Sequence, residues 1–147
     1  MSIKEIGRLP GTWRLVSYEA RDSTGQTHYP LGKHVTGQLI YDDDGNMSAH
    51  IMREGRPTFA SNDHGQGTDA EVRAAFEGHF SYFGTYMVNP TKQTVTHHVQ
   101  GCSYPNWIGN DQVRYYSFDD ARLLLSTPPI VFGGQSLETV LIWERPY

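Results

Sequence analysis

The chain consists of short segments of alternating apolar and polar residues, separated by clusters of turn-forming residues. Successive side chains of a β-strand point to opposite faces, so alternation over about four to eight residues is typical of a half-buried strand. On this criterion we predict strands at residues 12–20, 36–41, 47–53, 79–88, 93–101, 112–118, 122–126 and 135–144. Short turns separate several of them, and residues 42–46 have the composition of a hairpin tip. The pattern predicts an all-β fold of about eight to ten antiparallel strands.

One segment has the pattern of a short helix instead. Thr68 and Glu71 match a capping box, in which each side chain satisfies a free backbone N–H at the start of a helix. We expect this helix to continue to about Glu77 and to stop at Gly78. Its apolar side should face the sheet, with the residues Val72, Ala75 and Phe76. A further short helical turn is predicted at residues 3–9.

The length of 147 residues fits a single domain, which we place at residues 1–147. The formal net charge is -4 without a basic stripe, so nucleic-acid binding is not expected. No Lys/Arg-rich amphipathic helix and no run of roughly 18 apolar residues is present, which argues against a membrane role. Cys102 is the only cysteine, and the first residues lack the apolar core of a signal peptide. These features favour a cytoplasmic protein without disulfides.

Two motifs mark the ends of the predicted sheet. Trp13, in a Gly-x-Trp motif, opens the first strand, and Arg145 follows the last one. This pair resembles the two ends of a lipocalin-type barrel, in which the Trp plugs one end and the Arg lies across its indole. A cation over an aromatic ring gains about 0.5–2 kcal/mol. The resemblance implies that Trp13 and Arg145 are in contact.

Longer stretches extend the resemblance over nearly the whole chain. The bacterial and fungal lipocalin-like domain proteins are similar to it at residues 11–17 (GTWRLVS), 37–49 (GQLIYDDDGNMSA), 82–86 (YFGTY), 97–99 (HHV) and 123–129 (LLLSTPP). The resemblance implies a closed antiparallel up-and-down lipocalin-like β-barrel with one short helix. The strand pattern alone also allows a β-sandwich. A barrel of about eight strands encloses room for one small ligand, and similar barrels serve as binding proteins and as cyclases or isomerases.

Strand parity assigns candidate residues to the barrel interior. His97 and His98 are neighbours on one predicted strand, so their side chains point to opposite sides of the sheet. Because a ligand-binding lumen can be the more polar face, we predict that His98 points inward and His97 outward. Applied to the other strands, the same alternation rule predicts that these residues face the lumen: His50, Tyr82, Tyr86, His98, Arg114, Tyr116 and Glu138. Trp107, in a loop with proline and glycine, is a further candidate for ligand contact.

The chemistry of this set fits two functions. As catalytic residues, His98 would transfer protons with help from Tyr116 or Tyr86, and Arg114 would hold negative charge on the substrate. The protein would then be a cofactor-independent isomerase, cyclase or lyase of a small hydrophobic metabolite. The same residues would also orient a bound hydrophobic or aromatic molecule without reacting with it. We take small-molecule binding in a partly apolar, partly polar cavity as the first interpretation and catalysis as the alternative.

No metal site or cofactor is expected. The histidines lack the spacing of a zinc-binding helix, and a lone cysteine provides no thiolate cluster. The Asp-rich tip at residues 42–46 lacks the spaced ligands of an EF-hand. Apolar loop residues around Trp107 and Phe132 leave three interpretations open: a ligand portal, a subunit contact such as a homodimer interface, and packing over the end of the barrel.

Overall fold

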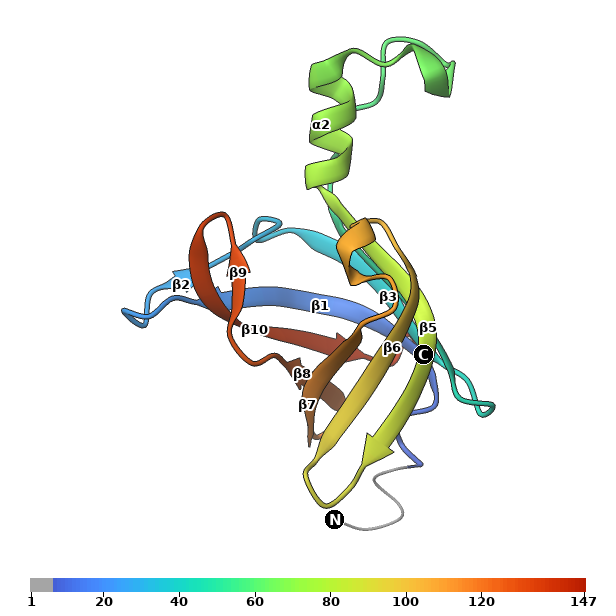
Figure 1. Cartoon of the computed structure of the whole chain (residues 1–147), viewed down its shortest axis with the longest axis vertical. Helices are drawn as coiled ribbons and strands as arrows, with labels where there is room; N and C mark the ends of the chain where they lie inside the picture. Colours follow the sequence, from blue (N-terminus) through green and yellow to red (C-terminus); the bar gives the residue numbers. More distant parts are fainter. Residues whose placement is uncertain (1–6) are drawn as a thin grey trace.

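A closed antiparallel β-barrel forms the body of the protein, as a computed structural model describing residues 7–147 shows (Figure 1). The wall consists of β1 (Gly11–Arg21), β3 (Val35–Tyr41), β4 (Asn46–Arg53), β5 (His79–Asn89), β6 (Thr94–Cys102), β7 (Asp111–Asp119), β8 (Arg122–Ser126) and β10 (Gln135–Glu144). These strands pair in this order, and β10 also pairs with β1. Closure removes the free edges of the sheet. The predicted barrel is confirmed, and the sandwich is excluded.

Short elements lie beside the wall strands. β2 (Thr27–His28) pairs with β1, and β9 (Ile130–Phe132) forms a hairpin with β10. Two 3-10 turns, η1 (His64–Gln66) and η2 (Pro105–Trp107), lie in loops. The predicted helical turn at residues 3–9 falls largely on residues 3–6, which lie outside the described part of the chain. Within residues 7–147, no helix has the length and apolar character needed to cross a membrane.

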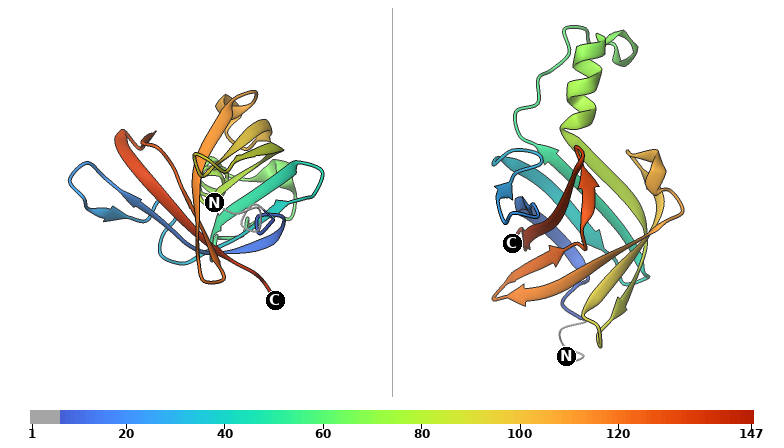
Figure 2. Two further views of the ribbon diagram at one scale, coloured as in Figure 1. Left: turned by 90° about the horizontal axis from the view of Figure 1, so that it is seen from below. Right: turned by 60° about the vertical axis from the view of Figure 1, so that its left-hand side comes forward.

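The helix α2 (Asp69–Glu77) begins at the predicted capping box. Thr68 Oγ1 accepts from the Glu71 backbone N–H at 3.1 Å, and the Glu71 carboxylate accepts from the Thr68 N–H at 2.9 Å. The helix stands off one end of the barrel instead of lying over the sheet (Figures 1 and 2). Val72 and Phe76 are therefore more than half exposed, so the prediction that they face the sheet is wrong. A capping box fixes where a helix starts, not where it docks.

The predicted contact between Trp13 and Arg145 closes one end of the barrel. Trp13 is 1% exposed, and the Arg145 guanidinium carbon lies 3.6 Å from the centroid of its ring. Arg145 also donates to the carbonyl oxygens of Thr12 at 3.2 Å and Pro10 at 3.0 Å. The arginine thus ties the last strand to the segment that opens the first, and the prediction is confirmed.

Replacing this arginine is expected to weaken the barrel measurably. Arg145→Ala removes both the cation–π contact and the carbonyl hydrogen bonds, and we expect a loss of about 2 kcal/mol in the free energy of unfolding. Arg14→Ala is the matched control: its ion pair with Glu144, at 2.7 Å, is exposed, and should contribute less than about 1 kcal/mol. Urea denaturation monitored by circular dichroism measures both. Equal losses in the two variants would contradict the role assigned to Arg145.

The other end of the barrel, here called the rim, carries the irregular elements. It is formed by the end of β1, the start of β5, the end of β6 and the end of β8. The helix α2 leads into β5 here, and η2 follows β6. Side chains that face inward near the rim are the ones a ligand would meet first.

Candidate functional site

The interior face of β6 carries His97, not His98. His97 is 1% exposed, whereas His98 is exposed and its Nδ1 lies 2.8 Å from Oδ1 of Asp111. The prediction that His98 faces the lumen is therefore wrong. The reason lies in the neighbours of His97 on its own face: Val95 and Val99 are fully buried. Burial of these apolar side chains, not the polarity of the alternative face, sets the orientation of the strand.

Two further predicted lumen residues lie on the outer surface. His50 on β4 and Glu138 on β10 are both exposed, while the residues on either side of each are buried. The assumption of a polar inner face fails here for the same physical reason. The structure does place the other strand candidates inside: Tyr82, Arg114 and Tyr116 are 7%, 8% and 2% exposed, and Tyr86 is half-buried.

Strand register brings Tyr86 and His97 together. They are directly opposite across β5 and β6, so they must share one face of the sheet. The register of the two strands shifts between this pair and the rim: Gly84 pairs with Val99, whereas Phe83 pairs with Gly101. Gly84 is required at this point, since a Cβ there would collide with the backbone carbonyl of His98. The shift keeps Tyr82, on the rim side, pointing into the same lumen.

A buried hydrogen-bonded array runs through the lumen from Tyr41 to Tyr82 by way of His97. The Tyr41 hydroxyl lies 2.6 Å from His97 Nε2, and the Tyr82 hydroxyl lies 2.8 Å from His97 Nδ1. Burial, with a smaller contribution from the positive charge of Arg114, lowers the pKa of His97 from its ordinary 6.5 to about 3. The imidazole is therefore neutral at physiological pH, and both ring nitrogens are occupied.

The direction of the hydrogen bonds follows from satisfying every buried donor. A neutral imidazole has one N–H donor and one acceptor nitrogen, so one tyrosine must donate to it and the other must accept. Tyr41 is completely buried, and its hydroxyl is within hydrogen-bond distance of His97 Nε2. The arrangement without a buried free donor has Tyr41 donating to Nε2 and His97 Nδ1–H donating to Tyr82. In this arrangement the Tyr82 hydroxyl accepts from His97 and does not use its own proton in that hydrogen bond.

Arg114 adds a buried positive charge near this hydroxyl. Its Nη1 donates to the Val113 carbonyl at 3.0 Å, and no carboxylate among residues 7–147 forms an ion pair with it. Burial raises the pKa of Tyr82 and of Tyr18, and the charge of Arg114 opposes each rise. Burying a cation without a counter-ion is unfavourable for folding. Within the lumen, the Arg114 guanidinium also forms a hydrogen bond with the Tyr82 hydroxyl.

Trp107 of η2 covers this charge from the rim. The Arg114 guanidinium lies 5.5 Å from the centroid of the Trp107 ring. The same ring meets Phe80 and Tyr82 edge to face, with centroids 4.8 Å and 5.5 Å apart. Trp107 is itself half-buried. The predicted loop aromatic therefore lies beside Arg114 and Tyr82 at the rim.

Comparison with known proteins identifies the family. The profile of the lipocalin-like domain matches residues 10–146. The chain belongs to the lipocalin-like domain family. A relative in Aspergillus oryzae, named 4'-hydroxy-3'-methoxypropiophenone carrier protein, is 35% identical over 107 residues, which make up 67% of this chain and 96% of that protein. The family resemblance inferred from the sequence is confirmed.

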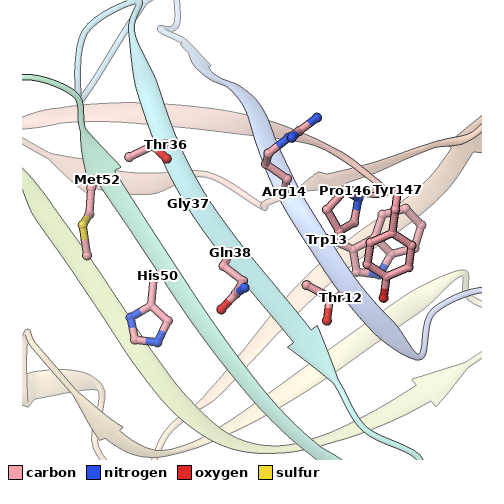
Figure 3. Close-up of a pocket in the computed structure, with 10 residues that line it drawn as sticks. All are labelled: Thr12, Trp13, Arg14, Thr36, Gly37, Gln38, His50, Met52, Pro146 and Tyr147. Atoms are coloured by element: carbon pink, nitrogen blue, oxygen red, sulfur yellow. The ribbon is translucent and has the colours of Figure 1, made fainter.

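The lipocalin-like barrel also has two hollows on its outer wall. The larger, of about 550 Å³, lies across β1, β3 and β4 next to the C-terminal residues Pro146 and Tyr147 (Figure 3). In Figure 3, Gln38 and His50 stand on the outer faces of neighbouring strands. The second, of about 400 Å³, lies around His50 and Phe83. The polar side chains of the larger hollow are mostly exposed, whereas the second hollow is also lined by the buried Tyr82 and the half-buried Cys102.

Sequence reasoning missed several residues of the lumen, among them Tyr18, Tyr41, Phe80 and His97. The signal for His97 was the pair of valines two residues away on each side, which marks the apolar face of β6. Tyr41 could have been found in the same way, since Leu39 precedes it on the buried face of β3. Tyr18 lies beyond a register shift between Leu15 and Ser17, which simple alternation does not reveal.

No group of three metal-ligating side chains is found in the part of the lipocalin-like barrel that the structure describes.

The apolar residues Val131 and Phe132 of β9 and Ile108 after η2 are exposed. A homodimer interface at these loops stays a prediction.

Proposed function

We propose that this lipocalin-like barrel is a carrier that binds a small aromatic ketone or phenol in its lumen. The observation that supports it most directly is the buried Arg114 guanidinium, without a carboxylate partner in residues 7–147, beside the Tyr82 hydroxyl, which the Arg114 guanidinium and His97 Nδ1 both reach by hydrogen bonds. Both groups donate hydrogen bonds, so they suit carbonyl, phenol or phenolate oxygens. The relative named as a carrier of a hydroxylated, methoxylated aryl ketone supports the same ligand class.

The rest of the lumen suits the aromatic part of such a ligand. Phe80, Trp107 and Tyr82 form edge-to-face contacts at the rim side, a setting in which a further ring can pack. Nearer the closed end, the Trp143 indole N–H is buried and has no acceptor in the described structure. It is another donor on an inward-facing side chain. A ligand with an aromatic ring and more than one acceptor oxygen matches this inventory.

The environment of His97 favours binding over acid–base catalysis. An efficient general base has a pKa near the working pH, whereas burial and Arg114 lower the pKa of His97 to about 3. Both ring nitrogens of His97 form hydrogen bonds with tyrosines. His98, which the sequence predicted for proton transfer, lies on the outside of the barrel. These side chains orient and stabilise the site. The isomerase, cyclase or lyase alternative therefore has less support than the carrier.

Isothermal titration calorimetry with 4'-hydroxy-3'-methoxypropiophenone tests the proposal. We expect one binding site per chain, with quenching or a shift of Trp107 emission on binding. Trp13 and Trp143 are 1% exposed at the closed end, so a Trp107→Phe variant identifies the responding tryptophan. Chromatography of the ligand after long incubation should recover it unchanged. A new product would support the enzyme alternative, and the absence of binding would contradict the carrier.

Removing one hydroxyl should weaken binding selectively. Tyr82→Phe deletes the proposed donor to the ligand, and we expect about a tenfold to hundredfold weaker affinity, since hydrogen bonds to charged or strongly polar groups contribute about 1.5–3 kcal/mol. Tyr115→Phe is the matched control, because Tyr115 is 49% exposed on the outer face of β7. Calorimetry on both variants measures the effect. Equal affinities for the two variants would remove Tyr82 from the binding site.

A further inference from the structure

We infer that the lumen binds a para-acylphenol as its phenolate, with the anionic oxygen held by Arg114 and Tyr82. The inference rests on the proposed function and specifies the ionisation state and orientation of the ligand. A phenol with a para carbonyl shares its negative charge with the carbonyl oxygen, so it ionises more readily than simple phenols. The hydroxyl end of the ligand would then lie under Trp107, and the acyl end would point toward the closed end of the barrel.

The charge balance of the lumen supports this orientation. Among the described residues, the inward-facing positions of β4, β8 and β10 below the rim are apolar side chains and threonines. The titratable groups that face the same lumen are Tyr18, Tyr41, Tyr82, Tyr86, Tyr116 and His97, with the Cys102 thiol nearer the rim. Arg53, at the rim, is exposed and donates to the Leu31 carbonyl at 3.2 Å.

Arg114 is thus the one charged side chain in this part of the described lumen. The hydroxyls of Tyr18, Tyr41 and Tyr82 are neutral, because burial raises the pKa of each above the ordinary value of 10. In a medium of low polarity, an ion pair with a guanidinium is far stronger than in water. A ligand that supplies one negative charge neutralises the site, whereas a neutral ligand leaves the cation without a counter-ion.

The phenolic proton must leave when the ligand binds in this form. His97 does not take it, because both of its ring nitrogens already form hydrogen bonds. The tyrosines hold their own protons. The O–H bond of the ligand therefore breaks with release of one proton to bulk water, and the electron pair stays on the oxygen that contacts Arg114 and Tyr82.

Absorption spectroscopy of bound 4'-hydroxy-3'-methoxypropiophenone tests the inference, because its phenolate absorbs at longer wavelength than its phenol. The spectrum is recorded about one pH unit below the pKa of the free ligand, where about a tenth is ionised in solution. We expect the bound ligand to show mainly the phenolate band. Calorimetry in two buffers of different ionisation enthalpy should show close to one proton released per ligand, after correction for the fraction already ionised.

Two comparisons separate this inference from the proposed function. The 4'-O-methyl ether cannot ionise, and we expect it to bind at least about tenfold more weakly than the phenol. Arg114→Lys should keep the phenolate band, whereas Arg114→Gln should lose it, and the exposed Arg122→Gln should behave as wild type. Tight binding of the neutral phenol, without the band and without proton release, would overturn the inference and leave the carrier intact. Failure of wild type to bind either compound would overturn the carrier itself.

Discussion

Acidification from about pH 6.5 to about pH 4 is expected to lower the free energy of unfolding by about 3 kcal/mol through His97 alone. In the unfolded chain this histidine takes up a proton as the pH falls through its ordinary pKa of 6.5, whereas burial and Arg114 keep the pKa of folded His97 at about 3. The unfolded state therefore binds more protons throughout this window. Stability is fully present above the window and falls as the pH falls through it.

The effect of His97 is isolated by comparing variants, because carboxylates also titrate in acid. Urea denaturation at a series of pH values is measured for wild type, His97→Gln and His98→Gln. The His98 variant should show the same decrease in the free energy of unfolding on acidification as wild type. In the His97 variant this decrease should be about 3 kcal/mol smaller. If His97→Gln does not fold, an NMR titration of the His97 imidazole in wild type gives the answer directly. Protonation of the folded-state ring near pH 6.5 would contradict the buried Tyr41–His97–Tyr82 array.

Arg114→Met is expected to weaken binding of the aromatic ligand by about 100-fold and yet to stabilise the fold. Truncating a buried charged hydrogen-bond partner typically removes about 2–5 kcal/mol of binding free energy. In the protein without ligand, the same change removes a buried cation that has no carboxylate partner in residues 7–147. Replacing buried ions by apolar side chains of similar volume often stabilises a protein by about 1 kcal/mol or more.

Opposite changes in affinity and stability are the signature of a residue kept for function. Calorimetry gives the affinity, and urea denaturation gives the free energy of unfolding. Arg122→Met is the control, because Arg122 is half-exposed and lies 3.8 Å from Glu144. It should change neither quantity by more than about 0.5 kcal/mol. A loss of stability in Arg114→Met with unchanged affinity would make Arg114 a structural residue.

Fold prediction from the sequence succeeded where local patterns are sufficient. Alternation located the eight wall strands, the capping box located α2, and the end motifs gave the contact of Trp13 with Arg145. Each depends on residues close in sequence or on a family resemblance. The docking of α2 was not predicted, because the exposure of Val72 and Phe76 depends on where the rim directs the chain.

The candidate site was predicted only in part. Arg114, Tyr82 and Tyr116 share an inward face, as expected, but His97 replaced His98 because the flanking valines, not the polar residues, decide which side of β6 is buried. His50 and Glu138 were misplaced by the same assumption. The hydrogen bonding of the Tyr82 hydroxyl depends on the Tyr41–His97–Tyr82 geometry, which joins β3, β5 and β6 and is not visible from alternation within single strands.

The central claim is that the ligand occupies the lumen beneath Trp107, not the hollows of the outer wall. Intermolecular nuclear Overhauser effects between the aromatic and methoxy protons of 4'-hydroxy-3'-methoxypropiophenone and assigned protein side chains test it most directly. We expect contacts with Phe80 and Trp107, which line neither of the two outer hollows. Contacts confined to Gln38, His50 and Met52, which line the larger outer hollow, would contradict the account.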